Sequence, residues 1–324
     1  MLSRVAERVY WMGRYLERAE NSARLVNVNS HLLLDLPKGV TLGWWPLIEI
    51  TGSQELFHEH HEEATEKSVV KFLVADVKNP GSLSNSIYYA RENARTIRDI
   101  IPSEAWEKIN DLFDYVKHSL PTGLTRKNRF AFLQDVISRT QQITGLLSGT
   151  MLHNVGYDFL RLGRNLERAE MTSRIIDVRS ESIITAETED LVPFEQFQWV
   201  SVLHSMSAYQ AYRQEVQGII KSDNVLRFLM QNTYFPRSFT RCVNEAKISL
   251  LNLPNSKNLV GQADAMLKNI NKLNFKTMAD EPLDLLIDKL QIELGELNES
   301  ITGAYFSLER SQKAKQKNKV LTEA

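Results

Sequence analysis

The chain has little of what forces a backbone to turn, with 14 glycines and 9 prolines among 324 residues. Its single cysteine, Cys242, excludes an internal disulfide framework and is typical of a reducing compartment. No apolar run approaches the roughly 18 residues of a membrane-spanning helix. The first residues contain Glu7 and no apolar centre, so a secretory signal is not expected. These absences favour a cytoplasmic protein without a membrane segment.

Charge and motifs exclude further classes of protein. A formal net charge of −1 gives no overall attraction to nucleic acid, so any binding through charge must be local. The glycine-rich, GxSxG and HExxH signatures of nucleotide-binding proteins, hydrolases and metalloproteases do not occur in the sequence. Glu55 and His58, within a histidine-rich segment, match one ligand pair of di-iron bundles, but the second pair is missing. We expect neither a metal nor a cofactor.

Apolar residues recur at spacings of three and four along most of the chain. This period favours helices, and the alternation that strands need is rare. Connections are expected where prolines and polar residues interrupt the pattern, at 35–43, 77–82, 101–103, 120–129, 252–258 and 280–282. The sequence therefore predicts an all-α protein built from antiparallel helical bundles. A polar tail is expected to follow the last helical segment.

One charged phrase occurs twice. Residues 13–24 read GRYLERAENSAR and residues 163–174 read GRNLERAEMTSR, with eight of twelve positions identical at an offset of 150. A weaker echo pairs VVKFLVADVKNPGS (69–82) with VLRFLMQNTYFPRS (225–238), and Trp45 pairs with Trp199 between the two echoes. Because the order is kept and the unit has the usual size of a domain, we predict two tandem, internally duplicated bundles. Their bounds are 1–150 and 151–324.

On a helical wheel, the repeated charges lie beside an apolar stripe centred on Leu16. Glu17, Glu20 and Arg24 follow one edge of this stripe with Gly13, which leaves room for an approaching group, whereas Arg14 and Arg18 point away. The second copy repeats the arrangement, with Arg164, Glu167, Arg168, Glu170 and Arg174. Two interpretations remain open. The charges form half-buried pairs that fix helix packing, or they form a polar site for a cation, a proton or an anion.

A second basic feature belongs to the first half alone. In YYARENARTIRDI (88–100), Arg91, Arg95 and Arg98 recur at helical spacing, which predicts a single guanidinium face with Asn93 beside it. Such a face can bind a phosphate or an acidic peptide, although a solvated helix has the same pattern. The corresponding positions of the second half do not carry arginine, so the halves differ here.

The two charged phrases resemble the signature of the bacterial alpha-E domain, a helical family named for its Glu-Arg motif. Residues 77–110 resemble the next block of that family, including its Asn-Pro-x-Ser turn, and the second half departs from that turn at 235–238. The resemblance covers essentially the whole chain. It implies an accessory role in a proposed peptide synthesis or modification system, beside a circularly permuted ATP-grasp ligase and a transglutaminase-like protein.

These expectations favour a non-catalytic binding subunit of such a system, with no nucleic acid and no membrane as partner. Its candidate contact face comprises Arg91, Asn93, Arg95 and Arg98. The alternative is an enzyme that acts on an amino or carboxyl substrate. In that alternative Glu17 or Glu167 is the acid or base. The anchoring residues are then drawn from Arg18, Arg24, Arg168 and Arg174.

Overall fold

A computed structural model describes residues 1–35, 43–184, 192–275 and 283–306. Within these ranges every regular element is a helix, so the predicted all-α class is confirmed. Most of the expected connection at 35–43, all of that at 280–282, and the polar tail lie outside the described residues. The first seven helices are α1 (Ser3–Asp35), α2 (Trp45–Ile50), α3 (Gln54–His58), α4 (Glu66–Val74), α5 (Leu83–Arg95), α6 (Ser103–Gly123) and α7 (Arg129–Thr150). The next seven are α8 (Val155–Ile184), α9 (Val192–Ser205), α10 (Tyr209–Glu215), α11 (Ser222–Gln231), α12 (Phe239–Leu251), α13 (Lys257–Asn271) and α14 (Leu283–Tyr305).

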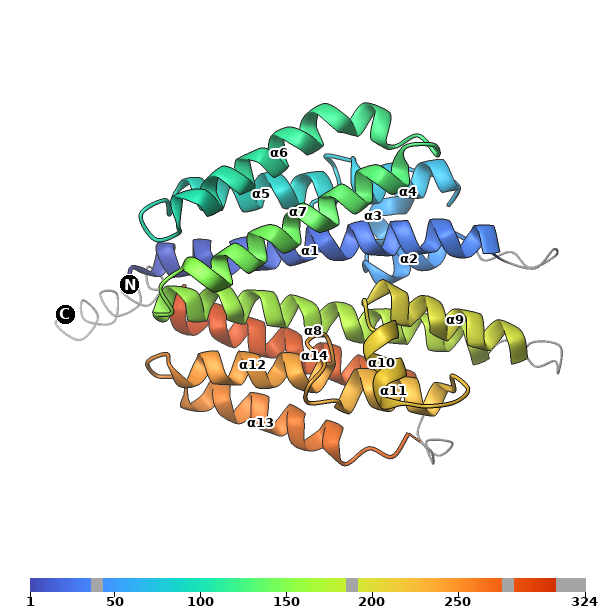
Figure 1. The fold of residues 1–324 in the computed structure, drawn as a ribbon. Coiled ribbons are helices and arrows are strands. Elements are labelled where there is room, and N and C mark those ends of the chain that lie inside the picture. Colours follow the sequence, from blue (N-terminus) through green and yellow to red (C-terminus); the bar gives the residue numbers. More distant parts are fainter. Residues whose placement is uncertain (36–42, 185–191, 276–282, 307–324) are drawn as a thin grey trace, which may run out of the picture.

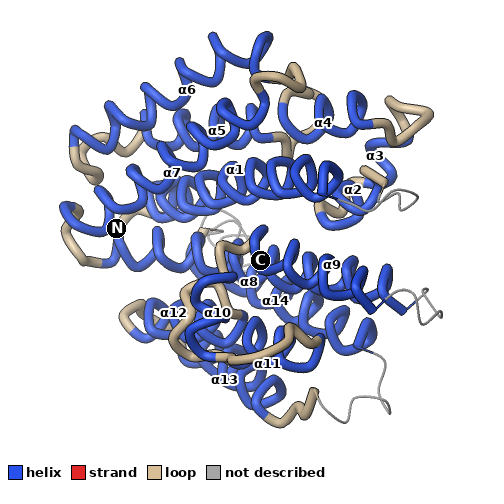
Figure 2. Tube along the Cα trace, turned by 45° about the vertical axis from the view of Figure 1, so that its right-hand side comes forward, coloured by secondary structure: helices blue, strands red, loops and turns tan. Residues whose placement is uncertain are grey.

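The two long helices that carry the repeated phrases occupy the middle of the molecule. Figure 1 shows α1 and α8 side by side and running in the same direction, from left to right in that view. The other helices form two groups, one on each side of this pair. Figure 2 shows α4 to α7 on one side and α11 to α13 on the other.

Each long helix is packed mainly by its own half. α5 and α7 pack on α1 with α6 outside them, and α12 and α14 pack on α8 with α13 outside them. Two short helices cross between the groups, since α2 packs on α8 and α9 packs on α1. A further contact joins α1 to α14, and among these contacts between the halves the one between α1 and α8 is the most extensive.

Local sequence accounts for where the packed helices begin. Ser82 caps α5 by accepting a hydrogen bond from the Asn85 backbone N–H, and Ser238 caps α12 in the same way from Arg241. Serine is favoured at this position because its hydroxyl satisfies an N–H that has no partner inside the helix. These two serines belong to the weaker echo, so corresponding residues begin corresponding helices.

The buried apolar side chains form one cluster that contains residues of both halves. The predicted boundary at 150/151 falls between α7 and α8. The division into two domains, and the duplication inferred from the sequence, remain predictions. No helix among the described residues combines the length and hydropathy needed to span a bilayer.

Candidate functional site

The repeated phrases face each other where α1 meets α8, and two glycines lie at the closest contact. A Cβ atom added to Gly13 would be 2.6 Å from the carbonyl oxygen of Leu160. One added to Gly163 would be 2.2 Å from the carbonyl oxygen of Tyr10. Any side chain there would push the helices apart. The sequence predicted room beside Gly13 for an approaching group, and that group is the backbone of α8.

The Glu-Arg pairs of the two phrases exchange partners across this contact. Arg18 donates two hydrogen bonds to the carboxylate of Glu167, at 2.6 and 2.9 Å. Arg168 reciprocates with an ion pair to Glu17 at 2.8 Å. Arg14 donates a further hydrogen bond to Glu167 at 2.7 Å. The charges thus hold one half of the chain to the other.

Both central carboxylates are buried, with side chains only 1% exposed at Glu17 and 4% at Glu167. Burial raises the pKa of Glu17, but the charges of Arg168 and Arg237 outweigh it and lower the pKa to about 2. Burial also raises the pKa of Glu167, and its facing arginines lower that pKa to about 2. Both groups are therefore ionised at neutral pH and cannot donate a proton there.

The helical wheel was wrong about Arg14 and Arg18, which were predicted to point away from the core. The side chain of Arg14 is 5% exposed, and it also donates to Asn298 at 2.9 Å. Arg18 is largely covered and bound to Glu167. The reason is that α1 is packed on two faces. The apolar stripe faces its own half, and the polar face that seemed solvated meets α8.

Further along each helix, the phrases end in matching ion pairs at i,i+4. Arg24 pairs with Glu20 at 2.8 Å, and Arg174 pairs with Glu170 at 3.1 Å. The pairs differ in exposure, because the side chain of Glu20 is 3% exposed and that of Glu170 is 33% exposed. This last pair of each phrase is therefore buried in the first copy and partly exposed in the second.

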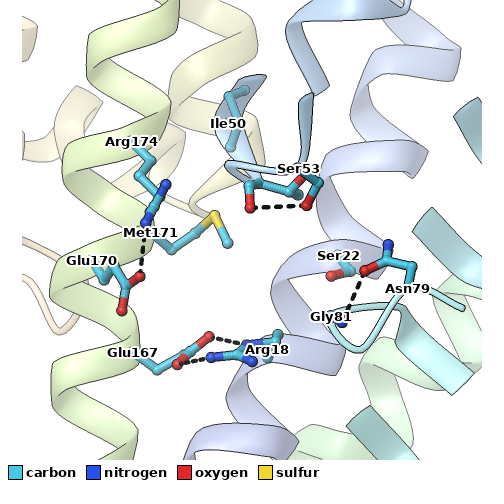
Figure 3. Close-up of a pocket in the computed structure, with 11 residues that line it drawn as sticks. Arg18, Ser22, Ile50, Ser53, Asn79, Gly81, Glu167, Glu170, Met171 and Arg174 are labelled. Carbon is cyan, nitrogen blue, oxygen red and sulfur yellow. Dashed lines mark hydrogen bonds and ion pairs between the residues drawn. The ribbon is translucent and has the colours of Figure 1, made fainter. Parts of the chain in front are cut away.

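A polar pocket of about 240 Å³ lies against the second copy. Figure 3 shows Glu167, Glu170 and Arg174 from α8 on one side of it, and Arg18 from α1 on the other. The turn before α5 closes the pocket with Gly81. The remaining lining residues are Ser22, Ile50, Thr51, Ser53, Asn79 and Met171. This pocket presents charges of both signs to a small polar group.

Sequence reasoning missed the role of Arg237, which it noted only as a departure from the Asn-Pro-x-Ser turn. Arg237 donates hydrogen bonds to Glu17 at 2.6 Å and to Asn21 at 2.9 Å. Its other terminal nitrogen donates to Glu20 at 2.7 Å. The first copy of the phrase is therefore covered by an arginine from the second half. An available signal was the alignment of Arg237 with Gly81 in the weaker echo.

The predicted arginine face is only partly present. α5 ends at Arg95, so Arg98 lies in the following turn and the three arginines do not share one helix. Arg91 and Arg95 both pair with Glu92. Arg98 lies over the Trp106 ring at 4.0 Å, and Arg91 lies over the same ring at 5.8 Å. Arg95 and Arg98 are exposed, whereas Arg91 is half-buried and already has partners.

Asn93 was predicted beside this face, and the structure contradicts that position. It is buried, and its side-chain oxygen accepts a hydrogen bond from Arg8 of α1 at 3.0 Å. The asparagine lies on the side of α5 that packs against α1, because position 93 turns inward when Arg91 and Arg95 face outward.

The lone cysteine lies in the core. Cys242 is buried, and burial raises the pKa of its thiol to about 12, so it is an unreactive core residue. Among the residues that the structure describes, no group of three His, Cys, Asp or Glu side chains is placed to hold a metal ion.

Comparison with known proteins identifies the family of this chain. A family model of the Alpha-E domain, described as a predicted alpha-helical domain with a conserved ER motif, matches residues 1–306. The chain belongs to the Alpha-E family. It is 24% identical over 323 residues to the uncharacterized proteins Mb2597 of Mycobacterium bovis and MT2643 of Mycobacterium tuberculosis. These matches cover 94% of this chain and 35% of each relative. No solved structure matches it.

The geometry gives the Alpha-E ER motif a physical meaning. The motif reads Glu17-Arg18 in the first copy and Glu167-Arg168 in the second, and each glutamate is bound by the arginine of the other copy. A buried carboxylate is tolerated when a guanidinium faces it, and here the guanidinium comes from the opposite half. The motif therefore makes the packing of the two halves depend on both copies.

Proposed function

We propose that this Alpha-E protein is a non-catalytic binding subunit of a peptide synthesis or modification system. In this proposal it acts in the cytoplasm with a circularly permuted ATP-grasp ligase and a transglutaminase-like protein. The observation that carries the non-catalytic binding role is that both glutamates of the ER motif are already paired with arginines. Glu17 and Glu167 are buried, paired and ionised, so their chemistry is used to join helices.

The same observation weakens the enzyme alternative. A general acid or base works best when its pKa lies near the operating pH, and it must reach the reacting atom. With pKa values of about 2, Glu17 and Glu167 are weak bases at neutral pH and are covered by arginines. The anchoring residues of that alternative are all engaged in ion pairs with the glutamates of the two phrases, and the most exposed of them, Arg174, is 31% exposed.

The proposal of larger partners draws support from the relatives. The chain spans about a third of the length of the curated relatives that it matches. In those proteins the matching region is joined to further sequence, as expected for a module that works beside other domains. Arg95 and Arg98 are the exposed part of the predicted contact face. Tyr88 and Tyr89, which are 44% and 40% exposed, precede them on α5.

Co-purification with the ATP-grasp ligase tests this function directly. The purified chain is mixed with the ligase, the complex is isolated by gel filtration, and ligase turnover is measured with and without the chain. We expect a complex and a change in turnover. The double variant Arg95→Glu/Arg98→Glu should weaken the complex, whereas Arg227→Glu, at an exposed arginine of the second half, should leave it unchanged.

Two results would reject the proposal. One is the absence of a complex together with unchanged ligase turnover. The other is amide-forming or amide-hydrolysing activity from the purified chain alone, which would favour the enzyme alternative. If Arg227→Glu weakens the complex as much as the double variant, the partner does not use the predicted face.

A further inference from the structure

The pocket beside Glu167 and Glu170 has a counterpart beside Glu17 and Glu20. The charged phrases align at an offset of 150, and the segments 69–82 and 225–238, which contain the two turns, align at an offset of 156. A turn lies beside the pocket and another beside its counterpart. Each turn ends in a serine that caps the next helix, Ser82 for α5 and Ser238 for α12. The correspondence lets the contents of one place be compared with those of the other.

The last arginine of each phrase shows the same correspondence. A Cβ atom on Gly52 would be 2.6 Å from Arg174, and Gly52 has a φ of 62°. Ser207 has a φ of 53° and accepts a hydrogen bond from Arg24 at 2.5 Å. Arg174 of α8 thus contacts a residue with a left-handed backbone after α1, and Arg24 of α1 contacts one after α8. The pocket and its counterpart are therefore lined in the same way.

The pocket and its counterpart differ in what they hold. Beside Glu17 and Glu20, the side chain of Arg237 from the second half fills the space, and its guanidinium bridges the two carboxylates. Beside Glu167 and Glu170, the residue aligned with Arg237 is Gly81 of the first half, which has no side chain to fill the space. The pocket of about 240 Å³ lies where that side chain would extend. Glu170 is correspondingly exposed, whereas Glu20 is buried.

The first arginine of each phrase, called here the inner arginine, also differs in its contacts between the two copies. Arg14 bridges Glu167 at 2.7 Å and Glu170 at 2.5 Å, much as Arg237 bridges the other two carboxylates. Arg164 is the counterpart of Arg14 in the second phrase, yet within the described residues it forms no ion pair with Glu17 or Glu20. Its charge still interacts with that of Glu17, and it also lies near the hydroxyl of Tyr157.

These contacts describe one charged cluster in two arrangements. Where the guanidinium of Arg237 bridges Glu17 and Glu20, the inner arginine, Arg164, forms no ion pair with them among the described residues. Where the pocket is open, the inner arginine, Arg14, bridges Glu167 and Glu170. Arg14 already donates to Asn298 at 2.9 Å and lies 3.5 Å from the Tyr10 hydroxyl, so it has partners to keep if an incoming group takes Glu170.

We propose that the pocket binds a guanidinium group, of free arginine or of an arginine side chain in a peptide, between Glu167 and Glu170. This inference deepens the proposed binding function, because it names the chemistry that the binding subunit recognises. The positive charges of Arg18 and Arg174 do not prevent it. Arg168 and Arg24 stand in the same positions around the guanidinium of Arg237.

The chemistry favours guanidinium over ammonium. A planar guanidinium reaches two carboxylates at once in the geometry that Arg237 displays, whereas an ammonium is a compact point charge. One acceptor is lost, because Met171 stands at the position that corresponds to Asn21. The ligand should therefore be held more weakly than the built-in arginine, which suits a site that must also release it.

Calorimetric titration of the full chain tests the inference without any partner protein. The probes are L-arginine, agmatine and N-acetyl-L-arginine amide, with N-acetyl-L-citrulline amide as a neutral analogue of the same shape. We expect the arginine amide to bind at one site and the citrulline amide not to bind. Stronger binding of the amide than of L-arginine would identify a peptide as the source, and the reverse would identify the free amino acid.

Three variants locate the site. G81R should place a side chain in the pocket and abolish binding, since a Cβ on Gly81 meets only the Asn79 side chain, at 3.3 Å. G149R adds an arginine where nothing lies within 4 Å and should bind as wild type does. E170Q removes a charged acceptor and should weaken binding about tenfold or more. Circular dichroism confirms that each variant is folded.

The outcomes separate this inference from the proposed function. Failure of every guanidinium probe to bind wild type overturns the pocket assignment, and so does binding that survives G81R. If G81R is unfolded, undiminished binding by folded E170Q is the overturning result. Binding of acetate or phosphate in place of the guanidinium probes would also overturn it. None of these results depends on the ligase, whose complex is measured separately.

Discussion

Gly163→Ala should destabilise the protein, although the same change elsewhere in a helix stabilises it. The new Cβ would lie 2.2 Å from the carbonyl oxygen of Tyr10, a backbone atom that cannot rotate away. Restoring a normal contact requires α8 to move by about 1 Å from α1, and such overpacking costs about 1–3 kcal/mol. The gain in helix propensity, about 0.5–1 kcal/mol, offsets only part of that cost.

Gly295→Ala is the matched control. Gly295 lies in the interior of α14, and a Cβ there meets nothing within 4 Å. Only the propensity effect remains, so this variant should gain about 0.5–1 kcal/mol. The two alanine variants should therefore move the free energy of unfolding in opposite directions.

Urea unfolding measures both effects, followed by circular dichroism and by the fluorescence of the five tryptophans. Coincident transitions by the two probes are needed before a free energy is extracted, because a chain of this length can unfold in steps. If Gly163→Ala proves as stable as Gly295→Ala, the helices do not approach as described. The reciprocal ion pairs that depend on this contact would then also be in doubt.

Three further predictions concern charge and capping. Because the pKa values of Glu17 and Glu167 are lowered from 4.5 to about 2, their stabilisation is complete above pH 4.5 and is lost as pH falls towards 2. Linkage gives a loss of about 3 kcal/mol for each; a urea midpoint that is constant across that range would contradict this. Glu20→Ala should cost about 1–3 kcal/mol, because buried arginines lose a partner, and Glu170→Ala, at the exposed copy, should cost less by the same assay. Ser238→Ala should lower the stability by about 1 kcal/mol through the lost cap of α12, and an unchanged melting temperature would argue against that cap.

The fold class was predictable because it depends on local patterns. Apolar spacing identifies helices, and Ser82 and Ser238 mark where two of them begin. The exact end of α5 was not predictable from the spacing of its arginines. The backbone N–H of Thr96 bonds to the Asn93 carbonyl, three residues back, and closes the helix before Arg98.

The site was predictable only in part. The wheel correctly placed Glu17 beside the apolar stripe, but it treated the face of Arg14 and Arg18 as solvated. A wheel describes one helix and does not reveal which neighbour covers each face. The pocket was beyond sequence reasoning for a similar reason, because segments far apart in the chain form it, as Arg18, Gly81 and Glu170 illustrate.

The exchange of partners between the two phrases bears on how this architecture can assemble. Arg18 of one phrase meets Glu167 of the other, and Arg168 meets Glu17 in return. Between separate chains, such reciprocity defines an isologous contact, the kind that closes a two-fold dimer. Here one chain supplies both faces, so the contact forms at a high effective concentration whatever the protein concentration. A protein with a single copy of the phrase would need a second molecule to complete its charges, and its stability would then rise with concentration.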